Sequence, residues 1–182
     1  MQGAHDPRRS RRSIRHPGFN YADPGAYFIT LCAYQRRFLF GQMVGGKMSL
    51  SACGRIVEEE WRRTQSIRSE ISLDQFVIMP NHIHAIVKIS DRNNRDSDYL
   101  LLVRRSRLSR RSLGSLVAGF KSSVTKRVKE QRQVSSDPLW QRNYYEHVIR
   151  DQKDLLSLRD YIATNPMRWA FDRENPQRDK PV

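Results

Sequence analysis

Hydrophobic and polar positions alternate in much of the chain as they do in half-buried strands. Four such segments in the first half are rich in β-branched and aromatic residues and are bounded by Gly, Pro, Asn and Asp. They are residues 27–32, 38–44, 73–79 and 82–90, of which 38–44 is short and predicts an edge strand or a turn. A further segment, 139–150, is aromatic enough for a strand or an extended stretch.

Three other segments repeat apolar residues at three- and four-residue spacing, which predicts amphipathic helices. The first follows Ser51, and the second follows Ser112, a candidate N-cap. The third is capped by Asp151 and ends at Asn165-Pro166, because the residue before a proline disfavours the α conformation.

The resulting order of elements is β, α, β, β, α, β and a last helix. It predicts an α+β, ferredoxin-like fold with a largely antiparallel sheet, helices on one face and an additional C-terminal helix. A length of 182 residues fits one domain with its own core. We expect that domain to span 19–172, with an exposed basic loop at 91–111, between a basic flexible arm at 1–18 and a polar tail at 173–182.

The excess of basic residues narrows the range of possible functions. The chain has 33 Lys and Arg against 19 Asp and Glu, a formal charge of +14, which is typical of proteins that bind nucleic acid. A merely basic protein or a membrane-surface binder is the alternative. No apolar run approaches the roughly 18 residues of a membrane span, and no apolar segment follows the arginine-rich N-terminus as in a signal peptide. Cys32 and Cys53 lack metal-site spacing and are expected to be reduced. We therefore expect a cytoplasmic protein with no membrane partner.

Several basic side chains are candidate contacts to phosphates, individually weak and collectively credible. They lie in the arm, in the basic loop, on the second helix and in the aromatic segment that follows it. The second-helix lysine is also compatible with a solvated helix face. The candidates are Arg8, Arg9, Arg11, Arg12, Arg15, Arg104, Arg105, Arg107, Lys121 and Arg142.

Two histidines stand two residues apart in the strand at 82–90. Side chains at i and i+2 of a strand point to the same face, which aims His82 and His84 at one spot about 7 Å apart or less. Such a pair can hold a metal ion, although two half-buried imidazoles satisfied by neighbours are the alternative. On the last helix, Tyr161 and Asn165 lie four residues apart and share a face. A core tyrosine is the alternative there.

Four motifs in this chain resemble, in order, those of the REP-associated tyrosine transposases. These belong to the single-tyrosine HUH superfamily, named for a His-hydrophobic-His motif. The resemblance covers about residues 12–170. The motifs are Met79–His84, Ser112–Gly114 with Gly119–Ser122, Trp140–His147, and Asp160–Ile162 with Asn165-Pro166.

The resemblance implies a metal-dependent endonuclease and strand transferase acting on single-stranded or hairpin DNA. It implies that His82 and His84 are metal ligands and that Tyr161 is the nucleophile, with a 5′-phosphotyrosyl intermediate. Simpler superfamily members place a third ligand, a glutamine, one turn after the tyrosine, where this chain has Asn165. The implied cofactor is Mg²⁺ or Mn²⁺, with no other small molecule.

Alternatives remain at two levels. Tyr144 and Tyr145 are rival nucleophiles, although packing or stacking on exposed bases suits them better. His147 is a candidate proton carrier or a structural hydrogen-bonding partner. For the whole protein, the alternatives are an HUH replication initiator or relaxase, against which Thr164 counts, and a non-catalytic nucleic-acid-binding regulator derived from a transposase.

Overall fold

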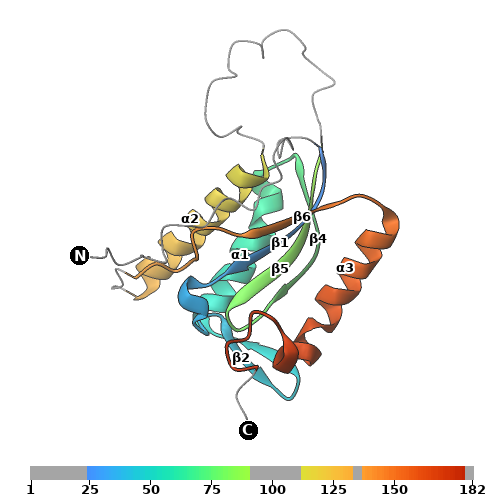
Figure 1. Ribbon diagram of the computed structural model, residues 1–182. Helices are drawn as coiled ribbons and strands as arrows, with labels where there is room; N and C mark the ends of the chain where they lie inside the picture. Colours follow the sequence, from blue (N-terminus) through green and yellow to red (C-terminus); the bar gives the residue numbers. More distant parts are fainter. Residues whose placement is uncertain (1–23, 91–111, 133–136, 179–182) are drawn as a thin grey trace, which may run out of the picture.

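The computed structural model describes residues 24–90, 112–132 and 137–178 (Figure 1). At its centre is an antiparallel sheet of four strands in the order β4-β5-β1-β6. The strands are β1 (Gly25–Cys32), β4 (Ile71–Ile78), β5 (His82–Ile89) and β6 (Tyr145–Ile149). The predicted basic arm and the basic loop, with the arginines 8 to 15 and 104 to 107, lie outside the described residues.

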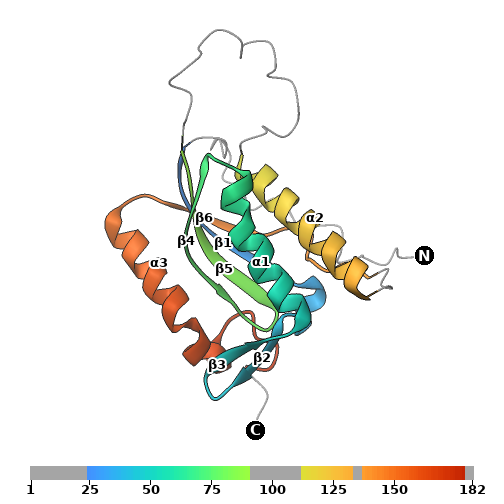
Figure 2. The same cartoon turned by 180° about the vertical axis from the view of Figure 1, so that it is seen from behind.

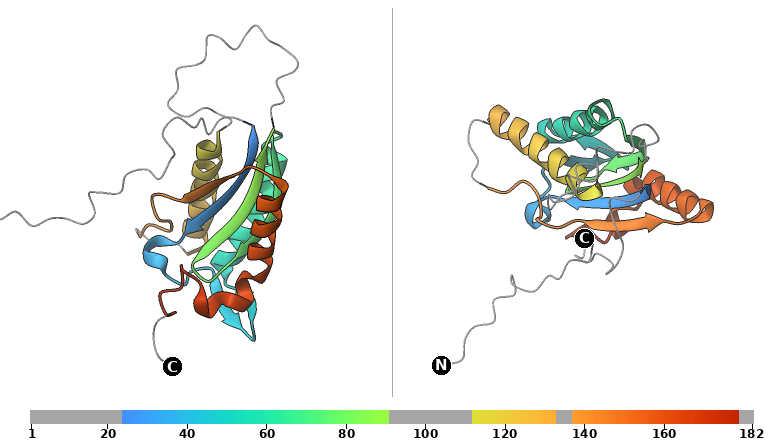
Figure 3. Two further views of the ribbon diagram at one scale, coloured as in Figure 1. Left: turned by 45° about the vertical axis from the view of Figure 1, so that its right-hand side comes forward. Right: turned by 90° about the horizontal axis from the view of Figure 1, so that it is seen from above.

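Two long helices connect strands that are not neighbours in the sheet. Helix α1 (Ala52–Ile67) lies between β1 and β4 in the chain, and α2 (Leu113–Arg132) lies between β5 and β6. Both cover the same face of the sheet, as Figure 2 and the view from above in Figure 3 show. This is the split β-α-β arrangement of a ferredoxin-like domain, so the predicted fold is confirmed.

The core lies between the sheet and these two helices. Strand β1 turns Tyr27, Ile29 and Leu31 toward it, and β5 turns Ile83, Ala85 and Val87 toward it, because alternate residues of a strand share a face. Trp61 of α1 and Phe120 of α2 meet edge to face, with ring centroids 5.1 Å apart. The alternation of β5 therefore leaves its histidines on the opposite face.

The third helix, α3 (Gln152–Thr164), lies on that opposite face and follows the β4 side of the sheet (Figure 3). A small apolar cluster holds it there. Its buried members are Phe28, Ile86 and Ile162, with Val77, Ile149, Leu155 and Leu158 partly buried beside them. Among the described residues, no helix covers the part of this face formed by β1 and β6 (Figure 3).

The helix boundaries follow their predicted caps. Ser51 Oγ accepts from Gly54 N at 3.0 Å, Ser112 Oγ accepts from Ser115 N at 3.2 Å, and Asp151 Oδ1 accepts from Asp154 N at 2.8 Å. After Thr164 the α-helix stops and the chain continues as a 3₁₀ helix, η4 (Asn165–Phe171). The predicted end at the Asn-Pro step is thus confirmed.

The structure makes two strand predictions more specific. The segment at 38–44, predicted to be an edge strand or a turn, contains β2 (Gly41–Val44), which pairs with β3 (Lys47–Leu50) in a separate hairpin after a short 3₁₀ turn, η2 (Tyr34–Arg36). Gly45 and Gly46 make its turn with φ of 56° and 74°, a conformation that favours glycine. The segment at 139–150 narrows to β6, because only its second half pairs with β1.

Among the helices of the described part, none is both long enough and apolar enough to cross a membrane.

Candidate active site

The two histidines meet on the face of β5 that α3 partly covers. Their side chains are almost fully buried, with exposed fractions of 0% for His82 and 3% for His84. The two Nε2 atoms are 3.0 Å apart. The structure thus brings together the pair that the strand alternation predicts.

The outer nitrogens of both rings are held by polar neighbours. The Asn81 amide donates through Nδ2 to the carbonyls of Arg36 at 3.2 Å and Glu174 at 2.8 Å, so its Oδ1 faces His82. His82 Nδ1 therefore donates to Asn81 Oδ1 at 2.8 Å, which leaves a lone pair on its Nε2. His84 Nδ1 lies 2.8 Å from Thr30 Oγ1. Such outer contacts are typical of metal-binding histidines, and nothing in the spacing of Asn81 or Thr30 identified them.

Burial keeps both imidazoles neutral. It lowers the pKa of His82 to about 3, and the positive charge of Arg36 acts in the same direction. Burial also lowers the pKa of His84 well below its usual value, followed by the effect of His82, while Asp172 opposes the shift. Neutral rings offer lone pairs, which is the form that binds a metal ion.

Asp172 is the acidic group of this cluster. Its Oδ2 lies 4.0 Å from His82 Nε2, and ligand atoms of His82, His84 and Asp172 all lie within 4.8 Å of one another. It is buried in the turn after η4. Sequence reasoning missed Asp172, because it lies outside every recognised motif and only the fold of η4 returns it to β5.

Asn165, the predicted third ligand, also reaches the cluster. Its Nδ2 donates to Asp172 Oδ2 at 2.9 Å. Its Oδ1 is buried and has no hydrogen-bond partner among the described residues. A buried amide oxygen without a partner is costly, and a bound cation would satisfy it. Two imidazoles, one carboxylate and one amide oxygen therefore form a donor set that could hold a divalent metal ion.

Tyr161 stands next to this donor set. It comes from α3, its hydroxyl lies 3.2 Å from His84 Nε2, and the side chain is 38% exposed. Burial, followed by the negative charge of Asp172, raises its pKa to about 12, against the effect of Asn165. The phenol is therefore protonated near pH 7. Tyr161 and Asn165 share the site, as their helical spacing predicts.

The rival residues lie elsewhere. Tyr145 points to the same sheet face but lies across β1 from β5, and Tyr144, which precedes β6, is partly buried against the core. His147 Nε2 lies 2.8 Å from Asp154 Oδ2 and so joins β6 to the first turn of α3. The Tyr161 hydroxyl, in contrast, contacts a histidine of the cluster.

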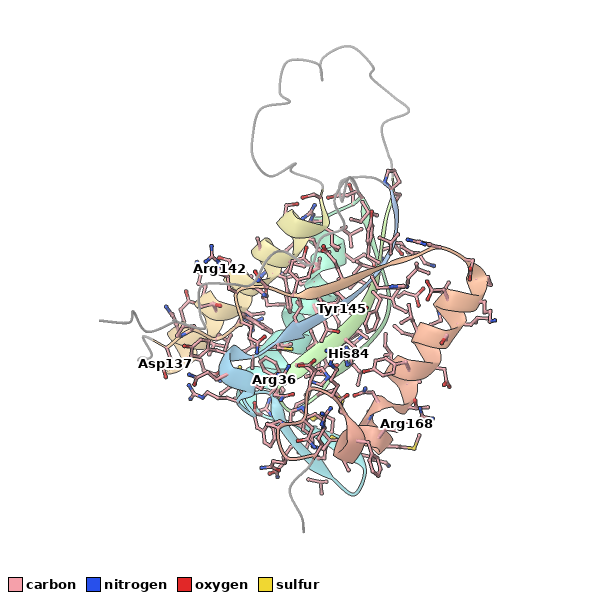
Figure 4. All side chains as sticks on the ribbon, in the orientation of Figure 1. Arg36, His84, Asp137, Arg142, Tyr145 and Arg168 are labelled. Carbon is pink, nitrogen blue, oxygen red and sulfur yellow. The ribbon has the colours of Figure 1, made fainter. Side chains whose placement is uncertain are left out.

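The predicted phosphate contacts differ in setting. Lys121 is partly buried, and its Nζ donates to the carbonyls of Gln141 at 2.7 Å and Asn143 at 3.4 Å. Burial lowers its pKa to about 8. Lys121 thus connects α2 to the segment before β6, and its ammonium group is directed toward backbone carbonyls. Arg142, in contrast, is exposed near α2 (Figure 4).

Part of the expected polar tail belongs to the site. Besides accepting from Asn81, Glu174 pairs its Oε2 with the Arg36 guanidinium at 2.8 Å. Asn175 is buried and donates to the Trp169 carbonyl at 3.0 Å. Residues 173–178 therefore close one side of the cluster.

An open cleft leads to the cluster between β6 and α3. Its volume is about 770 Å³. Lining side chains include Phe28, Arg36, His84, Tyr145, Tyr161 and Arg173. Tyr161 and His84 thus face a space that a substrate can enter, and Figure 4 shows His84 on the open front of the sheet.

Comparisons with known proteins address the family. No family model matches the sequence. An uncharacterized protein of Haemophilus influenzae is 36% identical over 167 residues, which are 90% of this chain and 92% of that protein. A second H. influenzae protein, assigned as a REP-associated tyrosine transposase, is 29% identical over 102 residues, 52% of this chain and 48% of that protein.

A solved structure, that of a REP-associated tyrosine transposase bound to a REP hairpin, has the same fold. It matches with a TM-score of 0.54 and 17% identity over 88% of this chain and 77% of that one. The chain and the uncharacterized protein belong to one family, related to the REP-associated tyrosine transposases. The resemblance found from the motifs is confirmed. In this transposase-related chain, His82 and His84 lie at the centre of the candidate site.

Proposed function

We propose that the protein is a metal-dependent endonuclease and strand transferase for single-stranded DNA, with Tyr161 as nucleophile. One observation carries the proposal. The Tyr161 hydroxyl lies 3.2 Å from His84 Nε2, beside two buried neutral imidazoles and the unpartnered oxygen of Asn165. A nucleophile next to an incomplete donor set is the arrangement that phosphodiester cleavage needs.

In this proposal the donor set is formed by His82, His84, Asp172 and Asn165. A divalent cation bound there supplies charge neutralisation for the phosphate and orients it toward the tyrosine. Asn81 and Thr30 fix the two rings by hydrogen bonds to their Nδ1 atoms. The chain thereby prepares a rigid site with the nucleophile at its open edge.

The covalent step is a substitution at phosphorus. The Tyr161 oxygen forms a bond to phosphorus, the bond to the 3′ oxygen breaks, and the proton of the phenol is lost while the 3′ oxygen gains one. The products are a 5′-phosphotyrosyl link and a free 3′-hydroxyl. Because one phosphodiester replaces another, reverse attack by a 3′-hydroxyl rejoins the strand without ATP.

Hairpin or palindromic DNA is the proposed substrate. The solved transposase of similar fold is described as bound to a REP hairpin, and this chain carries a formal charge of +14. A basic protein gains much of its affinity for DNA from phosphate contacts. Exposed Arg142 and Arg173 are the candidates among the described residues, and the arginines of the arm and the basic loop remain proposed contacts.

Covalent trapping tests the proposal. The protein is incubated with Mn²⁺ and hairpin oligonucleotides copied from palindromes flanking its own gene, and the adduct is resolved on a denaturing gel. We expect an adduct on the 5′ side of the cut that chelation prevents. Tyr161→Phe removes the nucleophilic oxygen and should abolish it, whereas Tyr144→Phe is the matched control. A DNA-linked peptide containing Tyr144 or Tyr145 would contradict the assignment, and DNA binding without an adduct would favour a regulator.

A further inference from the structure

Tyr145 is an exposed aromatic residue on the reactive face with no part in the proposed chemistry. In the sheet it pairs with Thr30, which in turn pairs with His84, so the three side chains are cross-strand neighbours on one face. The ring is 46% exposed. Figure 4 shows Tyr145 and His84 side by side on the front of the sheet. Its exposure means that Tyr145 adds little to the core.

Phe28 connects this tyrosine to the nucleophile. The ring of Tyr145 meets Phe28 edge to face, with centroids 6.3 Å apart and an interplanar angle of 70°. Tyr161 meets the same ring at 6.0 Å and 70°. Phe28 also stacks on His84 at 5.4 Å. The two tyrosines therefore flank one apolar floor, and that floor adjoins the donor set.

The space above this floor is suited to a flat polar-edged ligand. The cleft of about 770 Å³ lies within the range of roughly 300–1,000 Å³ typical of ligand sites. Phe28 and Leu158 give it apolar surface, while Gln141 and Asn143 offer polar groups at its edge. Arg36, Arg173 and Glu174 also line it, and because Glu174 pairs with Arg36, exposed Arg173 is the cation available to a phosphate of a nucleotide.

We infer that Tyr145 is a stacking platform for an unpaired nucleobase next to the scissile phosphate. The inference rests on the proposed function for the identity of the strand. Stacking on an aromatic face requires no particular base, since every base has a π face. The contact with Phe28 already orients the ring, so little side-chain freedom is lost when a base binds. The base would hold the strand while Tyr161 attacks its phosphate.

The neighbouring tyrosine provides a matched control. Tyr144 also lines the cleft, but it is partly buried against the core, and Lys121 Nζ lies 5.9 Å from its ring centroid. The two tyrosines are adjacent in sequence and identical in chemistry, and Tyr145 is the more exposed of them. The larger effect on base-dependent binding is therefore expected at Tyr145.

Two single strands separate base contacts from phosphate contacts: oligothymidylate and an abasic strand of the same length. Dissociation constants are measured by fluorescence anisotropy for the wild type, Tyr145→Leu, Tyr145→Phe and Tyr144→Leu. We expect Tyr145→Leu to weaken oligothymidylate binding by about 5- to 150-fold and to leave abasic binding unchanged. Tyr145→Phe keeps the π face and should stay within about threefold of the wild type, and Tyr144→Leu should weaken oligothymidylate binding less than Tyr145→Leu does.

The outcomes distinguish this inference from the proposed function. Equal oligothymidylate binding by the wild type and Tyr145→Leu, or an equal loss with both strands, would overturn the platform even if the wild type forms the hairpin adduct. Base-dependent loss at Tyr145 in a protein that forms no adduct would uphold the platform and reject the nuclease. Circular dichroism of each variant checks the fold.

Discussion

The two faces of the central sheet are built from the same strands and differ in what they hold. On one face, β1 and β5 contribute only apolar residues to a large core with α1 and α2. On the other, the same strands carry Phe28, Thr30, His82 and His84, and a much smaller apolar cluster holds α3. Alternation along a strand thus separates stability from chemistry by one residue.

This separation has an energetic cost. The reactive side buries two imidazoles, a carboxylate and three amides, each of which needs a hydrogen-bonding partner or an ion. The core between the sheet, α1 and α2 is mostly apolar, although it also buries Glu60, which Ser123 and Arg127 contact. Substitutions on the two faces should therefore affect different measurements, and the following predictions test that division from the largest effect to the smallest.

Removing a histidine should affect chemistry above all. His84→Ala deletes one proposed ligand nitrogen and the contact to Tyr161, so single-turnover cleavage with Mn²⁺ should fall by at least about 1,000-fold. Binding of Mn²⁺, followed by electron paramagnetic resonance, should weaken as well. A variant that cleaves at near the wild-type rate would show that the pair holds no catalytic metal.

A substitution at Ile83, next to His84 in β5, should affect stability more than cleavage. Ile83 is fully buried in the core, and Ile83→Ala should destabilise the protein by about 2–5 kcal/mol in urea unfolding. At a temperature where the variant remains folded, its cleavage rate should stay within a few-fold of the wild type. Loss of metal binding in the folded variant would mean that the two faces are not independent.

The attachment of α3 lies between these extremes. Its Arg159 makes two hydrogen bonds to Asp74, at 2.9 Å and 2.6 Å, where a register shift between Leu73 and Phe76 interrupts β4. Asp74→Asn should cost about 1–3 kcal/mol and lower cleavage, because Tyr161 lies two residues after Arg159. Arg159→Lys keeps the positive charge but loses the two parallel hydrogen bonds, so this variant should retain only part of the stability that the ion pair contributes.

The same pair predicts a pH dependence. The Arg159 guanidinium holds the pKa of Asp74 well below its usual range, with burial opposing and the Gln75 amide and Lys88 assisting. Because the pKa of Asp74 is lower in the folded state than in the unfolded state, its ion pair stabilises the fold at pH values above the unfolded-state pKa. This stabilisation is lost as the pH falls toward the folded-state pKa. The difference in unfolding free energy between the wild type and Asp74→Asn should shrink below about pH 4. A constant difference down to pH 2 would assign the effect to packing.

Much of the fold was predictable because its strands and helices are strongly periodic. The helix caps Ser51 and Asp151 were identified, as was the shared face of His82 and His84. The hairpin partner Lys47–Leu50 was missed because four residues are too few for a period to stand out. Asp172 was missed as a site residue for a different reason: its approach to His82 joins segments far apart in the chain, which no local pattern encodes. Asn81 lies beside His82 in a recognised motif, but its orientation depends on its bond to the Glu174 carbonyl, which the spacing does not reveal.

The smallest effect is expected at the pair that joins β6 to the start of α3. His147 Nε2 lies 2.8 Å from Asp154 Oδ2, and both side chains are partly exposed to solvent. Solvent-exposed ion pairs contribute about 0–1 kcal/mol to stability. His147→Gln keeps a hydrogen-bond donor, so it should change the free energy of unfolding by less than about 1 kcal/mol. Cleavage should change by less than about threefold, because a structural partner carries no proton in the reaction. A 100-fold loss of rate, with a shifted pH profile and intact folding, would instead make His147 the proton carrier and extend the reactive face to β6.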